Sequence, residues 1–173
     1  MGLVCSHIVF ALKNSRYDWQ KIKRRKAVGY IAPTFSFFKS EEEDLVIKIL
    51  CDIAAELELK IVALNLCGDH VHAMIIHSPN EISKLMLLWK GKAAYTFNKN
   101  NFKPDNNSEG LVTSNKQEGL WAKSYFQRIM KSPEEFQNVR RYILNNRLKH
   151  GLPPLTKFSI DLIHHLISKN NPL

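Results

Sequence analysis

The sequence has few cysteines, no long apolar run and a shortage of acidic residues, and each deficit excludes a class of protein. The three cysteines, Cys5, Cys51 and Cys67, are scattered and offer neither a disulfide framework nor a zinc-knuckle spacing, so we expect small buried apolar residues. Apolar runs such as KIVALNL at 60–66 are too short to span a bilayer, and no basic region precedes an apolar segment at the amino terminus. We therefore expect a cytoplasmic protein with no membrane partner.

The deficit of acidic residues leaves a strongly basic chain. Lysine and arginine number 25 against 16 aspartates and glutamates, which gives a formal net charge of +9 and a pI near 9.5. Such an excess favours a polyanionic partner, because binding releases the counterions condensed on it. Hydrophobic residues make up 45% of the chain and charged residues 24%, the balance of a globular protein. We expect one domain of ordinary size, with nucleic acid as its favoured partner.

Two groups of basic residues are candidates for contacts to nucleic-acid phosphates. One follows the first predicted strand, and the other lies on the second predicted helix. The candidates are Arg16, Lys21, Lys23, Arg24, Arg25, Lys26, Lys84, Lys90 and Lys92. Tyr17 and Trp19 interleave with the first group and could stack on bases, although such a block is usually a solvated loop. Trp89 and Trp121 are further stacking candidates or core residues, and for Trp121 the core is favoured.

Hydrophobic periodicity predicts an alternation of strands and helices. Strands are predicted over 6–13, 60–66, 70–77 and 120–130, with the turn-like CGD joining the second and third in a hairpin. Helices are predicted over 41–58, 79–98 and 133–149, with a short one over 159–168. The order βαββαβ favours an α+β, ferredoxin-like antiparallel sheet with both helices on one face.

Cap residues and polar composition mark the ends of these elements. Ser40 with Glu43 predicts a capping box, and serine followed by proline predicts helix starts at Ser78 and Ser132. The polar residues 99–119 predict a long mobile loop.

The stretch GDHVHAMI places His70 and His72 one residue apart on a predicted strand. Side chains alternate along a strand, so both imidazoles point to one face, with Cβ atoms roughly 7 Å apart at ~3.3 Å rise per residue. They could converge on one metal ion, or they could be two strand histidines with no ligand role. A histidine pair is also an incomplete site, because a catalytic metal normally takes a third protein ligand.

A second candidate cluster lies on the helix predicted over 133–149. Tyr142 and Asn146 are four residues apart and therefore lie one above the other on one helix face. An amide oxygen is a competent ligand for a hard metal, and a phenol on the same face could be a nucleophile. Spacing alone leaves open a tyrosine at the edge of the core and a solvent-facing asparagine.

Taken together, four segments resemble the single-tyrosine transposases of the His-hydrophobic-His (HUH) endonuclease superfamily. These are the insertion-sequence 200/605-like enzymes and their relatives associated with repetitive extragenic palindromes (REP). The segments are SHIVFALKNSRY, GDHVHAMI, LWAKSYFQRIM and VRRYILNNRLKHGL. The resemblance implies a transposase domain over 1–152, followed by a tail over 153–173 with a short helix. Residues 67–69, Cys-Gly-Asp, depart from the Met-Pro-Asn often found there, and Arg147 stands where many relatives have proline.

By this resemblance the protein binds hairpin ends of single-stranded DNA, cleaves them and transfers strands through a 5′-phosphotyrosine intermediate. His70, His72 and Asn146 would hold Mg²⁺ or Mn²⁺, and Tyr142, on a C-terminal helix beyond the ferredoxin-like sheet, would be the nucleophile. The resemblance allows a homodimer in which the tyrosine helix acts in cis or in trans, and association with the nucleoid when DNA is bound.

Two other functions stay open. One is a transposase-derived regulator that binds DNA hairpins without catalysis. The other is a metal-dependent hydrolase in which the histidine pair activates water, and it would need an acidic group, for which the sequence offers Asp69.

Overall fold

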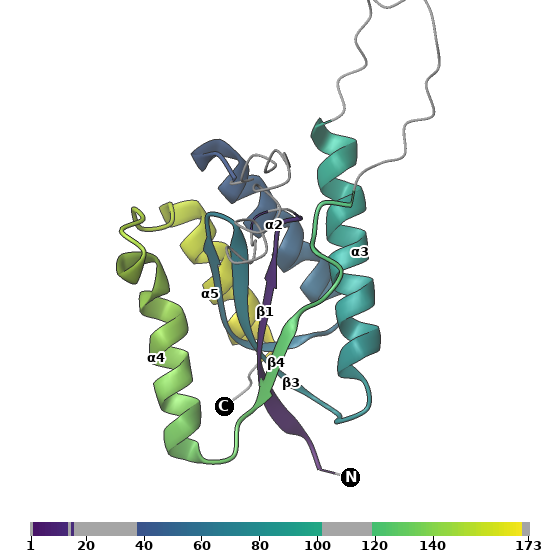
Figure 1. Cartoon of the computed structure of the whole chain (residues 1–173), viewed down its shortest axis with the longest axis vertical. Coiled ribbons are helices and arrows are strands. Elements are labelled where there is room, and N and C mark those ends of the chain that lie inside the picture. The colour runs from purple at the N-terminus through teal and green to yellow at the C-terminus, as the bar shows by residue number, and fades with distance from the viewer. Residues whose placement is uncertain (1, 14, 16–37, 102–118, 171–173) are drawn as a thin grey trace, which may run out of the picture.

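The computed structural model describes residues 2–13, 15, 38–101 and 119–170 of the chain. Strands and helices alternate along it, and Figure 1 shows their arrangement. The elements are β1 (Val4–Ala11), α2 (Ser40–Glu56), β2 (Lys60–Cys67), β3 (His70–His77), α3 (Ile82–Asn101), β4 (Phe126–Ile129), α4 (Pro133–Lys149) and α5 (Lys157–Asn170). Among the described helices, none is long and apolar enough to cross a membrane.

The four strands form a single sheet in the order β2-β3-β1-β4, and each neighbouring pair is antiparallel. β2 and β3 are joined by a tight hairpin turn in which Gly68 has a φ of 65°, a left-handed value that glycine adopts without strain. The other connections pass through α2 and α3, so β1 and β3 occupy the centre of the sheet. The predicted α+β, ferredoxin-like fold is confirmed.

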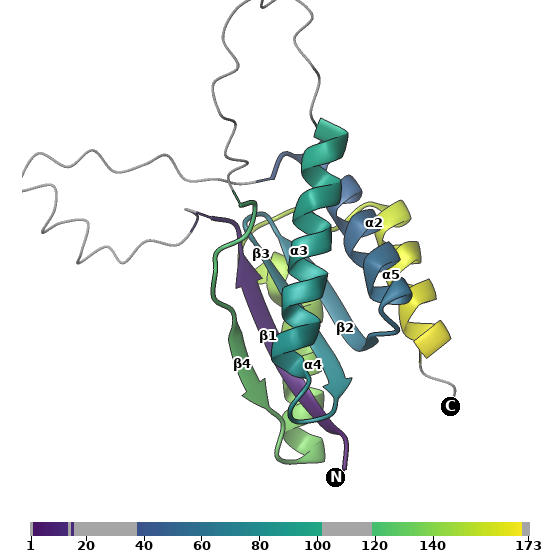
Figure 2. The same cartoon turned by 90° about the vertical axis from the view of Figure 1, so that its right-hand side faces the viewer.

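Helices cover both faces of the sheet (Figure 2). α2 and α3 pack on one face over the main core, in which Trp89 and Phe10 are fully enclosed, and α5 lies beside α2. α4 packs on the other face, where its Ile143 meets Val62 and Met74 of the sheet. Side chains of β3 alternate between these two layers, and His70 and His72 share the face of Met74. Both histidines therefore lie beneath α4.

Helix caps follow the sequence signals with two displacements. The start predicted at Ser78 is too early, because α3 begins at Ile82, and the Glu81 N–H donates to the Ser78 carbonyl in a turn before the helix. The Ser132 hydroxyl accepts a hydrogen bond from the Glu135 backbone N–H at 3.1 Å, which confirms the cap predicted for α4. The cap predicted at Ser40 is wrong by one residue. Lys39 is the N-cap of α2, and its backbone N–H donates to the Glu42 carboxylate at 2.8 Å.

The strand predicted over 120–130 is shorter than expected. Lys90 of α3 donates from its ammonium to the backbone carbonyls of residues 122, 123 and 124, at 2.7, 3.2 and 3.1 Å. These carbonyls are therefore engaged outside the sheet, and regular pairing begins at Phe126. Before that point Trp121 forms an isolated bridge with Leu12 at the end of β1.

The carboxyl-terminal segment holds a longer helix than the one predicted over 159–168. α5 packs against α2 and β2. The hydroxyls of Thr156 and Ser159 both donate to the Asp44 carboxylate at 2.5 Å, which fixes the start of α5 on α2. The boundary predicted at residue 152 stays a prediction.

Candidate functional site

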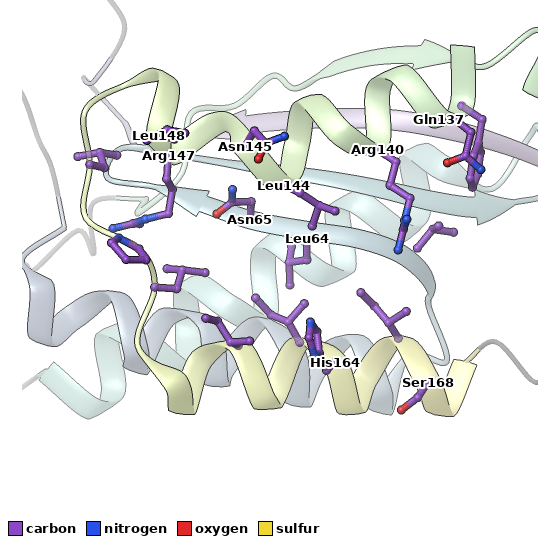
Figure 3. Close-up of a pocket in the computed structure, with 18 of the residues that line it drawn as sticks. Leu64, Asn65, Gln137, Arg140, Leu144, Asn145, Arg147, Leu148, His164 and Ser168 are labelled. Carbon is purple, nitrogen blue, oxygen red and sulfur yellow. The ribbon is translucent and has the colours of Figure 1, made fainter. Parts of the chain in front are cut away.

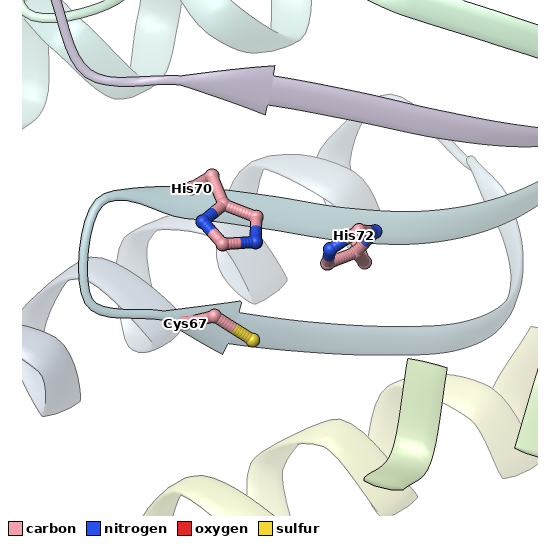
Figure 4. A group of neighbouring side chains, drawn as sticks. All are labelled: Cys67, His70 and His72. Carbon is pink, nitrogen blue, oxygen red and sulfur yellow. The ribbon is translucent and has the colours of Figure 1, made fainter. Parts of the chain in front are cut away.

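Three buried side chains with metal-ligating atoms meet at the β2–β3 hairpin (Figure 4). Cys67 ends β2, and His70 and His72 lie at the start of β3. Cys67 and His70 are cross-strand partners, so their side chains project from the same face of the sheet. One donor atom of each residue, the thiol sulfur or an imidazole nitrogen, lies within 4.8 Å of the others. The spacing suits convergence on a single ion.

Neighbouring side chains orient the two histidine rings. Nδ1 of His70 lies 2.5 Å from a carboxylate oxygen of Asp69, and Nδ1 of His72 lies 3.0 Å from Nε2 of His7 on β1. A histidine that binds a metal through one nitrogen commonly bonds such a group through the other, so Nε2 is the atom each ring can offer to an ion. Burial, together with the positive charge of Arg128, lowers the pKa of the His7 imidazole, which favours its neutral form as a partner for His72.

α4 lies across this cluster with one face toward the histidines. The ring centroid of Tyr142 is 5.5 Å from that of His72, and the centroid of His150 is 5.6 Å from that of His70. Asn146 lies midway between Tyr142 and His150 at intervals of four residues, and so on the same helix face. The structure therefore brings the two histidines, the tyrosine and the asparagine together.

Asn146 is the most unusual residue of this group. Its side chain is 0% exposed, and neither its amide oxygen nor its amide nitrogen has a hydrogen-bond partner within the described part of the chain. A buried unsatisfied polar group costs roughly 1–3 kcal/mol, so an asparagine here lowers stability unless it has a ligand. An amide oxygen on the helix face next to two imidazoles fits a divalent cation. The solvent-facing alternative for Asn146 is excluded.

Arg147 connects α4 to the sheet and to α2 through hydrogen bonds and an ion pair. Its guanidinium donates to both carboxylate oxygens of Glu43 in α2, at 2.9 and 3.0 Å, and to the backbone carbonyls of Leu66 and Pro153, at 2.6 and 2.7 Å. The same Glu43 carboxylate accepts from the Gly68 backbone N–H at 3.2 Å. Because Arg147 is only 5% exposed, this network forms a buried joint between α2, the hairpin and α4.

Comparison with known proteins agrees with this arrangement. The family model of IS200-like transposases matches residues 4–146, which is most of the chain. The chain belongs to the IS200-like transposase family. The resemblance predicted from the four sequence segments is thereby confirmed, and membership supports a transposase role.

Two solved structures with low sequence identity are similar to this family member. A REP-associated tyrosine transposase bound to a REP hairpin is 12% identical, with 94% of this chain and 81% of that chain covered and a TM-score of 0.55. A candidate transposase from Deinococcus radiodurans R1 is 21% identical, with 85% and 92% covered and a TM-score of 0.47. At this identity the first likeness shows the shared fold. No curated protein matches the chain.

The predicted phosphate-binding residues fall into two sets in this IS200-like chain. Arg16, Lys21, Lys23, Arg24, Arg25 and Lys26 lie outside the described residues. Lys84, Lys90 and Lys92 lie on α3, on the face of the sheet opposite α4 (Figure 2). Lys84 is exposed, and Lys92 forms an ion pair with Glu56. The buried ammonium of Lys90 is engaged by three carbonyls, which disagrees with the predicted contact to phosphate.

The structure reveals other groups near Tyr142 that sequence reasoning missed. Phe126 on β4 is 53% exposed, and its ring centroid is 5.9 Å from that of His7. Arg128, two residues along β4, is the cross-strand partner of His7 and is also largely exposed. Nζ of Lys149 lies 5.2 Å from the centroid of the Tyr142 ring. Lys149 thus borders the tyrosine directly. Phe126 and Arg128 lie next to His7, whose ring centroid is 6.1 Å from that of Tyr142, and Arg128 also forms an ion pair with Glu135. The sequence offers no signal for these three residues, because their nearness to the site depends on strand pairing and on the position of α4.

A large hollow lies on the other side of α4. Its volume is about 1150 Å³, and it is lined by β2, α4 and α5 (Figure 3). Leu144 and Leu148 face into it, and most of its other lining residues are also aliphatic. Leu144 follows Tyr142 by two residues, which places it about 200° around the helix. The hollow therefore lies on the side of α4 away from Tyr142, although Asn65, one of its lining residues, is the cross-strand partner of His72.

Proposed function

We propose that this protein is a single-stranded DNA transposase that binds hairpin ends and cleaves and transfers strands through a 5′-phosphotyrosine intermediate. The observation that carries the proposal is the meeting of Tyr142 on α4 with His72 on β3, with the buried, unsatisfied amide of Asn146 one helical turn away. A nucleophile beside a metal-ligating cluster is the arrangement that metal-assisted transesterification requires.

In this proposal, Nε2 of His70, Nε2 of His72 and the amide oxygen of Asn146 hold a divalent cation, Mg²⁺ or Mn²⁺. When bound, such a cation polarises a non-bridging oxygen of the scissile phosphate. Asp69 and His7 fix the two imidazole rings through their Nδ1 atoms.

Tyr142 performs the covalent step. Its phenolic oxygen attacks phosphorus, and the bond from phosphorus to the 3′ oxygen breaks. The proton that the phenol gives up is balanced by the one that the 3′ oxygen takes up as it leaves as a 3′-hydroxyl. One phosphodiester is exchanged for another, so a 3′-hydroxyl from a second strand can reverse the step without ATP. Tyr142 is 40% exposed, which supports access of a DNA strand to its hydroxyl.

The groups around Tyr142 support binding of a DNA strand across the site. Phe126 can stack on a base next to the scissile phosphate, and Arg128 and Lys149 can contact the flanking phosphates. The REP-associated relative is bound to a hairpin, and we extend that class of substrate to this chain. Lys84 and the basic residues within 16–26 remain candidates for contacts to the phosphates of the hairpin stem.

We further propose that Tyr142 acts in cis. The buried joint formed by Arg147 with Glu43 and Leu66 holds the tyrosine helix on the sheet of its own chain. A homodimer is compatible with this arrangement, but the site does not need a partner's helix.

The test is incubation of the purified protein with Mn²⁺ and an oligonucleotide that has a hairpin and single-stranded flanks. We expect a covalent protein–DNA adduct on a denaturing gel, together with a fragment that ends in a 3′-hydroxyl. Tyr142→Phe removes the attacking oxygen and should abolish the adduct while hairpin binding persists. Tyr95→Phe, at an exposed tyrosine on α3, is the matched control and should leave the adduct unchanged.

The same assay separates the two rival functions. Hairpin binding by the wild-type protein without cleavage indicates a regulator that lacks catalysis. Cleavage that persists in Tyr142→Phe and never yields an adduct indicates a hydrolase that activates water. Either outcome overturns the proposed chemistry.

A further inference from the structure

The hairpin that carries the two histidines also carries a thiol that the proposed function leaves without a role. Cys67 is buried, and its sulfur belongs to the group of donor atoms that lie within 4.8 Å of one another. We propose that the Cys67 thiolate is a further ligand of the cation held by His70 and His72, and that it makes the site select thiophilic ions, Zn²⁺ or Co²⁺, over Mg²⁺. This inference rests on the proposed function for the existence of a cation site.

The geometry of the hairpin supports a built site. The donors come from six consecutive residues, 67–72, and the turn between them is fixed by the left-handed Gly68 and by a hydrogen bond of 2.6 Å from the Asp69 N–H to the Cys67 carbonyl. Cross-strand pairing sets Cys67 directly opposite His70. The backbone of the hairpin thus brings the three residues together, and Asp69 and His7 orient the two imidazole rings.

A second observation comes from the opposite side of the cluster. Asn146 on α4 is fully buried, and its amide is unpartnered as judged within the described residues. It lies between Tyr142 and His150, whose rings are next to those of His72 and His70. Residues that could supply two imidazoles, a thiolate and an amide oxygen thus lie in two layers of the fold, the sheet and α4. Four protein donors leave a phosphate oxygen as the fifth, a coordination number that zinc reaches in catalytic transition states.

The chemical nature of these donors decides which ions fit. Mg²⁺ prefers oxygen ligands in octahedral geometry, whereas thiolate and imidazole favour zinc and its neighbours in the first transition series. Affinity for a site of this kind rises from Mn²⁺ to Co²⁺ in the usual order for divalent ions. We therefore expect Zn²⁺ and Co²⁺ to bind more tightly than Mn²⁺, and Mg²⁺ to bind most weakly.

Cobalt spectroscopy tests this assignment without depending on DNA cleavage. The full chain with Cys5→Ser and Cys51→Ser retains Cys67 as its single thiol, since the sequence has three cysteines. Titration of this variant with Co²⁺ should produce the near-ultraviolet charge-transfer band of a thiolate–cobalt bond. Adding Cys67→Ser should remove that band and weaken Co²⁺ binding at least about tenfold, because a direct ligand contributes no less than an outer-shell partner. In that triple variant the preference for Co²⁺ over Mn²⁺ should also fall.

The possible results separate this inference from the proposed function. If Co²⁺ binds to the single-thiol variant with its visible ligand-field bands but no charge-transfer band, or does not bind, the assignment of Cys67 is overturned. An adduct at Tyr142 in the same preparation would then leave the proposed function intact. A charge-transfer band in a protein that forms no adduct would support Cys67 as a ligand and count against the transposase chemistry.

Discussion

Replacement of Asn146 by leucine should stabilise the metal-free protein. The side chain is fully buried, and within the described structure both of its amide atoms lack hydrogen-bond partners. Each buried unsatisfied atom costs roughly 1–3 kcal/mol, whereas an apolar side chain of similar size has no such cost. Allowing for imperfect packing of the branched side chain, we expect Asn146→Leu to raise the free energy of unfolding by about 1–3 kcal/mol.

Addition of a metal ion should reduce or reverse this difference in stability, because the ion stabilises wild type more than the variant. At a concentration of 100 times its dissociation constant, a bound ion stabilises the wild-type protein by about 2.7 kcal/mol. If the loss of the Asn146 oxygen weakens binding by about 10- to 100-fold, the leucine variant gains about 0.4–1.4 kcal/mol at the same concentration. Urea denaturation without metal measures the intrinsic stability of each protein, and denaturation with Mn²⁺ or Co²⁺ measures the stabilisation by the ion. Asn145→Leu, at the exposed neighbouring position, is the control and should change neither the intrinsic stability nor the stabilisation by the ion.

A leucine variant that is less stable than wild type without metal by more than about 1 kcal/mol would contradict the unsatisfied state of the Asn146 amide. That result would mean that the amide makes structural hydrogen bonds in solution. Equal stabilisation of both proteins by the ion would contradict its role as a ligand.

Other substitutions test the joint of α4, the role of Lys90 and the choice between cis and trans action. Arg147→Met leaves a buried carboxylate unpaired and should lower the free energy of unfolding by about 3–5 kcal/mol in urea denaturation; a loss below about 1 kcal/mol would contradict the buried joint. Lys90→Met removes hydrogen bonds to three carbonyls and should cost about 1–3 kcal/mol, whereas Lys84→Met on the exposed face of the same helix should cost almost nothing. Equal effects of the two lysine changes would show that Lys90 is not structural. Mixing Tyr142→Phe with His72→Ala should not restore adduct formation if the tyrosine acts in cis; recovery of activity in the mixture would show action in trans.

Local signals in the sequence were sufficient for most of the fold. The period of the apolar residues and the serine caps depend on neighbours within one helical turn, and the βαββαβ order follows from them. The errors have non-local causes. The strand before Phe126 is shortened because Lys90, more than 30 residues earlier, engages its carbonyls. Glu43 follows the predicted cap Ser40 by three residues, but its carboxylate instead binds an arginine from α4.

The site was predicted in part for the same reason. His70 with His72, and Tyr142 with Asn146, could be identified because each pair has a spacing that strand or helix geometry converts into a shared face. His7 bonds His72 across 65 residues of sequence, and no periodicity indicates such a contact. The sequence predicts Cys67 as a small buried residue, and its burial is confirmed. Its position beside the imidazoles depends on the register of the hairpin, which the sequence does not specify to one residue.

Mapping the covalent adduct by mass spectrometry tests the central claim most directly. The adduct formed with a hairpin oligonucleotide would be digested with nuclease and trypsin, so that a residual nucleotide marks the attacking side chain. The chain has five tyrosines, so the assignment is specific. We predict a 5′-phosphotyrosyl nucleotide on the peptide that contains Tyr142. A nucleotide on any other residue, or hairpin cleavage with no modified peptide, would contradict the account.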